Sequence, residues 1–375
     1  MANIVNLLLK AGHQVETVGV LGSESYPETQ GFVKYPGLGA FTEYIDNPFL
    51  MDDWGISELF SKNDTFYTAL SSEIKEKPEW IHVEQPWLFD FAIRYKKENN
   101  LKDVPISYGS QNIEYQLKIG ILNSYMGKKF ADDGGVKVKN CEINALKNAN
   151  IVYCVSENDQ KWSRKYTKAE VILAQNGVRS MQLGINDIIN ANKVTGNHKN
   201  VLYCASAHPP NIQGFFNIFE NGIGFLSPNE KIVVAGSASD CISTDNRFSR
   251  ISGLKNHFIG AGQVSDSCLN GLINNCHVIA LPITHGGGTN LKTAEAIWSG
   301  KYIVATPTAM RGFERFIESK GVFVSSSPSE FCTNLQKAMS SPPLTLSAED
   351  INTRRIVLWE ETLKEMILSI SKGKI

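Results

Sequence analysis

A glycine triplet, Gly286 to Gly288, stands between an apolar run and a helix-forming segment in LPITHGGGTNLKTAEAIWSG, residues 281–300. Glycine leaves the peptide N–H groups open to a ligand, and a helix beginning at Thr289 or Asn290 adds the positive end of its dipole at the same point. Lys292 places a cation in the first turn of this helix, where it opposes the dipole unless an anion lies in front. The segment therefore predicts an anion site, with phosphate as the expected group.

The strands and helices that must position this loop are predicted to alternate along the chain. Apolar runs with the character of strands are followed by helix-like segments, and many runs end in small or polar residues where a helix would begin. The runs are HQVETVGV, WIHVEQPWL, VPISYGS, NIVYCVS, VILAQNGV, NVLYCAS, KIVVAGSA, HFIGAG, HVIALPI, YIVATPT and GVFVSS. The pattern predicts an α/β fold with doubly wound parallel sheets, in which ligands bind at the carboxyl ends of the strands.

The length of 375 residues predicts two domains, because a single core rarely grows to that size. The polar stretch NDIINANKVTGNHKN, residues 186–200, lacks periodicity and is interpreted as the linker. Residues 1–190 and 196–350 would then form two Rossmann-like domains that face each other across a cleft. Residues 352–372 are expected to form an amphipathic helix that packs back on the body. The apolar residues of this helix are Ile356, Trp359, Leu363, Met366, Ile367 and Ile370.

Composition and charge exclude several classes of protein. A formal net charge of −1 offers no global attraction to nucleic acid. The seven cysteines are scattered without C-x-x-C spacing, which indicates free thiols in a reducing compartment. No apolar stretch reaches the length that spans a bilayer, so the sequence predicts a cytoplasmic protein. Basic residues outnumber acidic ones between Arg94 and Lys168, where a solvated surface is favoured and peripheral contact with anionic lipid at the inner face of the membrane is the alternative.

The glycine loop and its surroundings resemble the retaining GT-B glycosyltransferases of glycosyltransferase family 4, the glycosyl transferases group 1. The likeness is densest at HGGGTNLKTAEAIWSGKYIVATPTAMRGFE, which is similar to the donor loop of one branch of that family. Other segments that follow the family's order are PEWIHVEQPWL, SYGSQNIEYQ, QNGV, SAHPPNIQGFFNIFE, FIGAGQVSD and LINNCHVIALP. The resemblance implies a GT-B fold of two Rossmann-like domains.

On the donor side, the resemblance implies that the glycine loop holds a diphosphate and that Lys292 neutralises it. Glu295 would accept hydrogen bonds from ribose hydroxyl groups, and its alternative is a helix-surface acid paired with Lys292. The donor-binding residues implied are Gly286, Gly287, Gly288, Thr289, Asn290, Leu291, Glu295 and Asn211. Gly287 stands where many family members carry a further glutamate, which removes one contact to the transferred sugar.

On the acceptor side, the resemblance implies contacts from Glu84, Gln85 and Glu114, and it groups Gln111 and Asn112 with Lys292 as catalytic residues. Gln111 and Asn112 stand where many members carry His-Asn, so hydrogen bonding is kept while the option of a positive charge is lost. Two alternatives stay open. Gln111 would be a turn residue without a ligand, and Glu84 would cap a neighbouring helix.

No metal and no cofactor are expected, because the chain has no D-x-D motif and no second histidine at metal-ligand spacing from His285. The helix terminus and Lys292 would stabilise the departing diphosphate instead. The expected function is retaining transfer of a sugar from a nucleoside diphosphate donor to a glycan or lipid-linked acceptor, in polysaccharide, lipopolysaccharide or glycoconjugate biosynthesis. The alternative is a catalytically impaired GT-B protein that binds a nucleotide or a partner. The sequence does not indicate an oligomeric state.

The N-terminus departs from the family pattern, in which a strand and a glycine loop precede the first helix. Here NIVNLLLKAGHQV places Ile4, Val5, Leu8 and Leu9 on a helical stripe at the start of the chain. The N-terminal domain is therefore expected to lack its first strand, and a start codon placed too far downstream is the favoured explanation.

Overall fold

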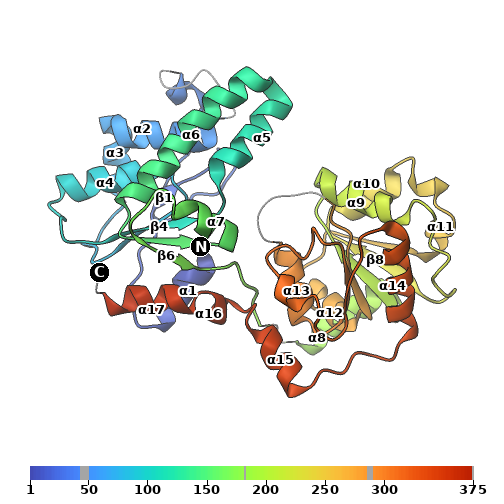
Figure 1. Ribbon diagram of the computed structural model, residues 1–375. Coiled ribbons are helices and arrows are strands. Elements are labelled where there is room, and N and C mark those ends of the chain that lie inside the picture. The colour runs from blue at the N-terminus through green and yellow to red at the C-terminus, as the bar shows by residue number, and fades with distance from the viewer. Residues whose placement is uncertain (43–49, 181–182, 285–289, 374–375) are drawn as a thin grey trace. The chain divides into compact units, whose positions relative to one another are not determined.

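The computed structural model describes residues 1–42, 50–180, 183–284 and 290–373. By its internal contacts the chain divides into unit 1, Met1–Gln175 with Thr362–Ile375, and unit 2, Asn176–Glu361 (Figure 1). Each unit is built around a parallel sheet of its own. The chain therefore passes between the units twice, and this division differs from the expected boundaries near residues 190 and 350.

Unit 2 contains a six-stranded parallel sheet in the order β12-β11-β10-β7-β8-β9. Its strands are β7 (Asn200–Cys204), β8 (Lys231–Ala235), β9 (Phe258–Gly262), β10 (Val278–Leu281), β11 (Tyr302–Ala305) and β12 (Val322–Val324). The strand order reverses between β7 and β10. Open α/β sheets bind ligands outside the carboxyl ends of their strands at such a reversal.

Helices cover both faces of this sheet. Three of them share one apolar cluster: α8 (Ile185–Thr195), α12 (Asp266–Asn275) and α13 (Leu291–Trp298). Three share the cluster on the other face: α9 (Pro209–Phe219), α10 (Ala238–Thr244) and α14 (Pro328–Ser340). The short α11 (Leu254–His257) precedes β9. Strand β7 sends Leu202 to the first cluster and Val201 and Tyr203 to the second, as expected of a parallel sheet buried on both faces.

Unit 1 contains a four-stranded parallel sheet in the order β3-β4-β5-β6 and a separate parallel pair of β1 and β2. The strands are β1 (Gly19–Val20), β2 (Phe32–Val33), β3 (Ile81–Glu84), β4 (Ile106–Ser110), β5 (Ile151–Cys154) and β6 (Glu170–Leu173). The helices are α1 (Ala2–Lys10), α2 (Ile56–Lys62), α3 (Asp64–Ser71), α4 (Phe89–Glu98), α5 (Glu114–Met126), α6 (Lys128–Asn148) and α7 (Glu157–Ser163).

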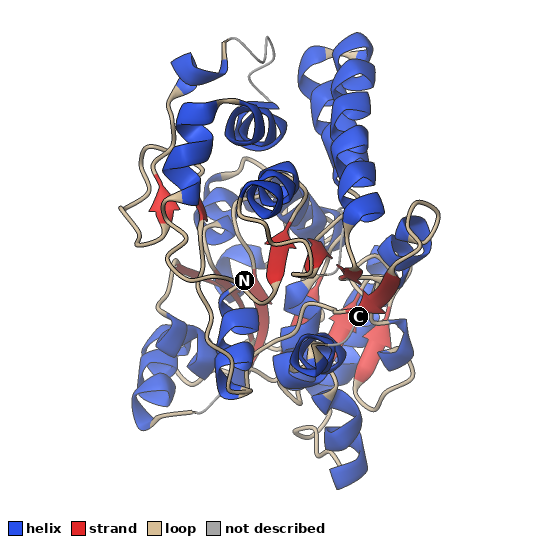
Figure 2. Cartoon of the chain, turned by 90° about the vertical axis from the view of Figure 1, so that its left-hand side faces the viewer, coloured by secondary structure: helices blue, strands red, loops and turns tan. Residues whose placement is uncertain are grey.

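Helices α5 and α6 lie side by side as a hairpin that extends beyond the sheet of unit 1 (Figures 1 and 2). Two glycines of α6 allow their close approach. A Cβ atom at Gly134 would lie 2.4 Å from Leu122 Cδ1, and one at Gly135 would lie 2.4 Å from Ile119 Cγ1. The apolar side chains of α5 therefore fill the space that any larger residue would need at these two positions of α6.

Each apolar run of the sequence contains a strand, and β2 is the one strand of the described residues that lies outside them. The predicted linker was wrong, because most of it forms α8. This helix packs on α12 so closely that a Cβ atom at Gly271 would lie 1.9 Å from Asp187 O. Its periodicity is hidden because it buries the small residues Ala191 and Thr195 while Ile185 is 79% exposed.

The expected C-terminal helix is divided into α15 (Ala348–Arg355), α16 (Trp359–Thr362) and α17 (Lys364–Lys372). The interruption has a long-range cause. Val178 N–H donates to Val357 O at 2.9 Å, and Trp359 N–H donates to Val178 O at 3.1 Å, so this part of the backbone pairs as a bridge. Beyond it, α17 packs on β6 of unit 1, and Ser369 Oγ lies 2.7 Å from Tyr153 Oη.

The helical stripe expected at the start of the chain is largely confirmed. Helix α1 buries Ile4 and Leu8 and leaves Val5 half-buried. Leu9 was wrongly placed on the stripe, since it is 51% exposed.

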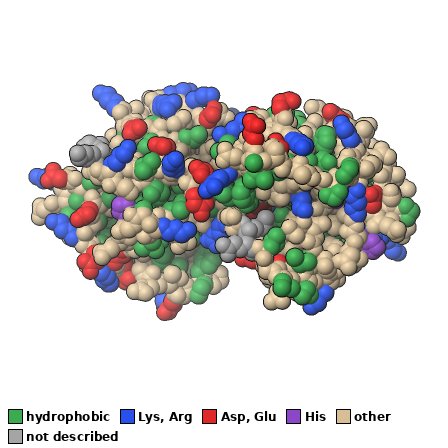
Figure 3. Space-filling model, turned by 90° about the horizontal axis from the view of Figure 1, so that it is seen from below, with side chains coloured by type: hydrophobic (Ala, Val, Ile, Leu, Met, Phe, Trp, Pro, Cys, Tyr) green, Lys and Arg blue, Asp and Glu red, His purple; other side chains and the backbone are tan. Residues whose placement is uncertain are grey.

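The structure also bears on the predictions made from composition. All seven cysteines are free thiols, as expected. Among the described helices none is long and apolar enough to cross a membrane. On the face of the molecule in Figure 3, Lys and Arg side chains are interspersed with Asp and Glu.

Candidate functional site

The donor-side residues that the structure describes gather at the start of α13 in unit 2. Asn290 is the N-cap of this helix, and its side-chain oxygen accepts the N–H of Lys292 at 3.2 Å. The helix start predicted at Thr289 or Asn290 is therefore confirmed to within one or two residues, and Leu291 is exposed at the first position. Gly286, Gly287, Gly288 and Thr289, with His285, lie outside the described residues.

Lys292 reaches from α13 to the start of α9. Its Nζ donates to Asn211 Oδ1 at 3.2 Å. The Asn211 amide is held in this orientation because its Nδ2 donates to Ser206 O at 3.0 Å and to Ser206 Oγ at 3.3 Å. Tyr203 Oη donates to the backbone oxygen of Asn211 at 2.9 Å. A neutral oxygen fixed in this way solvates the ammonium group without neutralising its charge.

Burial shifts the pKa values of three ionisable groups around this contact. Burial lowers the pKa of Lys292, while the negative charge of Glu295 raises it. Burial raises the pKa of Glu295, and Lys292 lowers it. Burial also raises the pKa of the Cys204 thiol, which therefore stays protonated. A half-buried cation in such a place gains stability from an anion brought next to it.

The alternative for Glu295, a surface acid paired with Lys292, does not match this geometry. Glu295 is half-buried, and it acts on Lys292 through its charge. Within the ranges that the structure describes, the hydrogen bond of the Lys292 side chain goes to Asn211 and no ion pair joins it to Glu295.

Two contacts that the sequence did not indicate hold α13 in place. Thr293 Oγ1 donates to Ala309 O at 2.6 Å in the first turn. At the other end, Arg354 Nη1 donates to Ile297 O at 3.0 Å, and its Nη2 donates to Lys320 O at 2.6 Å. Because both ends are anchored, the helix presents Lys292 and Glu295 in a fixed direction.

The acceptor-side residues lie at the carboxyl ends of β3 and β4 in unit 1. Glu84 is the last residue of β3, and Gly109 is its partner on β4. A Cβ atom at Gly109 would lie 2.9 Å from Glu84 Oε1. The carboxylate of Glu84 therefore lies over backbone that carries no side chain.

Both carboxylate oxygens of Glu84 are engaged. His82 Nε2 lies 2.9 Å from Oε1, and Gln111 Nε2 donates to Oε2 at 2.5 Å. His82 Nδ1 lies 2.9 Å from Ser107 Oγ, to which Trp80 Nε1 also donates at 2.8 Å. Burial raises the pKa of Glu84, but the hydrogen bonds and charge of His82 and the bond from Gln111 outweigh it, so the pKa is lowered. Among the described residues, the Glu84 carboxylate bonds to His82 and Gln111 rather than capping a helix.

Two further carboxyl groups, those of Glu114 and Glu142, lie at the start of α5. Glu142 of α6 is fully buried and accepts the backbone N–H of Glu114 at 2.7 Å and of Tyr115 at 2.9 Å. Burial raises the pKa of Glu142 to about 8, although these two bonds lower it. Burial also raises the pKa of Glu114, while the side chains of Asn112 and Gln85 lower it. Gln85 has a φ of 62°, which is uncommon for a residue with a side chain.

The structure thus brings Glu84 together with Gln111 and Lys292 together with Asn211, and it places Asn112 and Gln85 where both lower the pKa of Glu114. His82 was missed, although alternate residues of a strand share a face and His82 stands two positions before Glu84. Ser107, Trp80 and Glu142 were missed as well, since each acts across a distance in sequence that no local pattern reveals. In the part of the chain that the structure describes, no group of three or more His, Cys, Asp or Glu side chains could hold a metal ion.

Comparisons with known proteins add a family match for part of the chain and a fold. Residues 193–341 match the family model described as Glycosyl transferases group 1. No curated protein sequence matches the chain.

Solved structures match most of the chain at low sequence identity. Sucrose-phosphate synthase of Thermosynechococcus elongatus has a TM-score of 0.63 at 14% identity, covering 93% of this chain and 85% of that one. HepE of Anabaena, in complex with UDP and glucose, has a TM-score of 0.59 at 12% identity, covering 84% and 83%. WaaG, a glycosyltransferase involved in lipopolysaccharide biosynthesis, has a TM-score of 0.57 at 12% identity, covering 98% and 94%. At such identities the likeness shows the fold alone, an α/β protein with parallel sheets in two domains.

Proposed function

We propose, from the premise that residues 193–341 belong to the glycosyl transferases group 1 family, that this chain transfers a sugar from a nucleoside diphosphate donor to a hydroxyl group with retention of configuration. The observation that carries the proposal is the contact between Lys292 and Asn211 at the start of α13. A half-buried cation with a neutral partner, at the N-terminus of a helix, favours a ligand with concentrated negative charge. A diphosphate group meets that requirement.

Each donor-side residue has a separate role in the proposed reaction. Lys292, with the backbone of residues 286–289, would neutralise the charge that develops on the departing diphosphate, where one such donor is typically worth about 3 kcal/mol. Glu295 would accept hydrogen bonds from ribose hydroxyl groups. Asn290, Leu291 and Asn211 would complete the contacts to the donor. No metal or cofactor is assigned to this reaction, and the leaving phosphate itself would assist attack from the same face of the sugar.

On the acceptor side, we assign Glu84, Gln85 and Glu114 to the incoming hydroxyl group and its glycan or lipid carrier. Gln111 and Asn112 are assigned, with Lys292, as catalytic residues, and Gln111 would contact the transferred sugar. The support is local. Glu84 is held on both oxygens and its lowered pKa keeps it ionised, so it can accept a further hydrogen bond from a hydroxyl group. A role in polysaccharide, lipopolysaccharide or glycoconjugate synthesis at the cytoplasmic face of a membrane is part of the same proposal.

The proposal is tested by release of nucleoside diphosphate from a panel of nucleotide sugars incubated with mixed glycan and lipid acceptors. Lys292→Ala should lower that release by at least about a hundredfold, since it removes the charge opposite the leaving group. Lys255→Ala, at an exposed lysine of unit 2, is the matched control and should leave the rate unchanged. Full activity of Lys292→Ala, with unfolding temperatures equal in all three proteins, would contradict the proposal.

A second candidate function is binding of a nucleotide without transfer. One observation favours it, since the Gln111 amide that would contact the sugar already donates to Glu84. Calorimetry separates the two functions. Binding of UDP, ADP or GDP by a protein that releases no nucleoside diphosphate from any donor would support the second candidate.

A further inference from the structure

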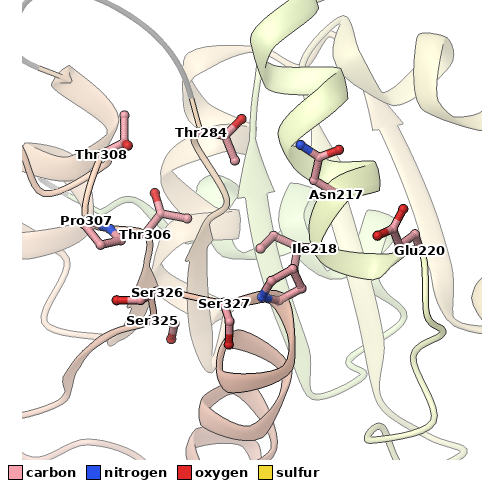
Figure 4. A pocket seen from close by; sticks show the side chains of 11 residues that line it. Asn217, Ile218, Glu220, Thr284, Thr306, Pro307, Thr308, Ser325, Ser326 and Ser327 are labelled. Atoms are coloured by element: carbon pink, nitrogen blue, oxygen red, sulfur yellow. The ribbon is translucent and has the colours of Figure 1, made fainter.

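A cavity of about 500 Å³ in unit 2 is lined by residues other than those assigned above (Figure 4). Helix α9 borders it on one side, and the loops that follow β10, β11 and β12 border it on the other. The lining residues are Asn217, Ile218, Glu220, Thr284, Thr306, Pro307, Thr308, Ser325, Ser326, Ser327 and Pro328. The cavity therefore opens at the carboxyl edge of the sheet, and its volume falls in the usual range of ligand pockets, roughly 300–1,000 Å³.

The charges around this cavity disfavour an anion. Glu220 is the one ionisable side chain among its described lining residues. Helix α14 begins at the cavity, but its first residue, Pro328, has no N–H, and the side chains at its start already bond to backbone N–H groups. Ser327 Oγ accepts the N–H of Glu330 at 3.2 Å, and Glu330 Oε2 accepts the N–H of Ser326 at 2.8 Å. With two carboxylates nearby and a capped helix, the site lacks what a phosphate group needs.

Four lining groups keep hydrogen-bonding capacity for a ligand. Asn217 Oδ1 accepts from Gln213 at 2.5 Å, which leaves Nδ2 of the same amide as a donor. The Glu220 carboxylate accepts, and the hydroxyl groups of Thr308 and Ser326 can do both. These four groups have no hydrogen bond to the residues that the structure describes. The cavity therefore offers donors and acceptors together, without a cation.

Other polar groups of the lining serve to hold the loops. Thr306 Oγ1 donates to Ile283 O and accepts the N–H of Ala309 at 3.1 Å. Asn334 Nδ2 donates to Ser325 Oγ at 3.0 Å. These bonds hold the backbone of the two loops that carry Thr308 and Ser326.

We propose that this cavity is a subsite for a neutral carbohydrate. Sugar hydroxyl groups would bond to Asn217, Glu220, Thr308 and Ser326, and the C–H face of the ring would lie on Ile218, Pro307 and Pro328. The cavity is separate from the Lys292 contact, because Asn211 and Asn217 are six residues, or about 9 Å, apart along α9. The inference goes beyond the proposed transfer reaction and does not depend on it.

The subsite is tested by titrating the full chain, labelled at isoleucine δ1 methyl groups, with maltose and with inorganic phosphate. The Ile218 resonance, assigned with Ile218→Val, should shift saturably with maltose and should not shift with phosphate. Glu220→Gln and Thr308→Val should each weaken maltose binding, the former by at least about tenfold because it removes a charged acceptor. Glu318→Gln, an exposed acid elsewhere in unit 2, is the control and should leave the affinity unchanged.

Three results of the first titration would overturn the subsite. These are no saturable shift of Ile218 with maltose, equal affinities of Glu220→Gln and Glu318→Gln, or a shift of Ile218 with phosphate. UDP is added in a second titration, and an unchanged maltose affinity is expected. Competition by UDP would place maltose in the donor site instead. Since the titration measures binding alone, it stands or falls separately from the Lys292→Ala test of transfer.

Discussion

At the residue scale, Asn211 provides the oxygen that the Lys292 ammonium group contacts. Its amide is oriented by Ser206, so the oxygen directed at Lys292 is neutral. Asn211→Asp would put a carboxylate in the same place, where it competes with an anionic ligand for the lysine. We expect the affinity for UDP, ADP or GDP, measured by calorimetry, to fall at least about tenfold.

The control for Asn211→Asp is Asn246→Asp, which adds the same charge at an exposed position of unit 2. It should leave nucleotide affinity unchanged. Equal losses in the two variants would mean that net charge, rather than the contact with Lys292, governs binding.

Glu142 makes stability depend on pH. Its pKa is raised from 4.5 to about 8, so the folded chain holds a proton that the unfolded chain has released between these values. The stability from protonated Glu142 is therefore present below the unfolded pKa and is lost as the pH rises through about 8. We expect the free energy of unfolding to fall by at least about 1 kcal/mol between pH 5 and pH 9 on this account.

Glu142→Gln should flatten that pH dependence, because an amide can still accept a backbone N–H but does not titrate. Urea denaturation across the pH range measures the effect. Glu157→Gln, at an exposed acid of α7, should keep the dependence of the parent chain. A parallel slope in Glu142→Gln would assign the pH dependence to other groups.

At the scale of elements, the position of α9 depends on Gly214. A Cβ atom there would lie 1.9 Å from Pro282 O, a backbone atom at the end of β10 that cannot move aside. Gly214→Ala should therefore push α9 off the sheet and draw Asn211 away from Lys292. We expect unfolding free energy to fall by about 1–3 kcal/mol and nucleotide affinity to fall with it.

Gly224→Ala is the matched control, because a Cβ atom at Gly224 would meet nothing within 4 Å. Urea denaturation and calorimetry on both variants make the comparison. If Gly214→Ala were as stable as Gly224→Ala, the close approach of α9 and β10 would have no energetic weight.

Helices and strands could be predicted from the sequence where the residues that determine them are close together in the chain. Apolar runs ending in small residues identified the strands, and the start of α13 followed from its capping residue Asn290. Helix α8 was misread because small buried residues, rather than its large apolar ones, face α12. The break after α15 was not readable, since it depends on Val178, far away in sequence.

Part of the candidate site could also be predicted from the sequence. Glu84, Gln111, Lys292 and Asn211 were predicted as candidate site residues. Their pairing was not, because it requires strand register in unit 1 and the meeting of α9 and α13 in unit 2. Arg354, which anchors the far end of α13, lies 57 residues from its partner Ile297 and carried no local signal.

At the scale of the whole molecule, the C-terminal segment belongs to unit 1 although it follows unit 2 in sequence. A chain that ends at Glu361 would lose α17, including the contacts of Ser369 with Tyr153 and of Ser371 with His13. We expect faster hydrogen exchange in β5 and β6 and unchanged exchange in the sheet of unit 2. Nucleotide affinity should also be kept, since Lys292 and Asn211 remain.

A chain that ends at Lys372 keeps α17 and serves as the control for this truncation. Peptide-level exchange measured by mass spectrometry reports both units in one experiment. Uniform acceleration in both sheets would show that the units do not hold their stability separately.

The double passage of the chain also sets an order of events on the ribosome. Residues 176–361 leave the exit tunnel as one continuous stretch, so unit 2 can close its core as soon as they are made. Unit 1 is begun earlier but waits for α17, which is synthesised after unit 2. Unit 1 is thus begun before unit 2 but completed after it, and during that interval the part of its sheet that α17 covers is open to chaperones.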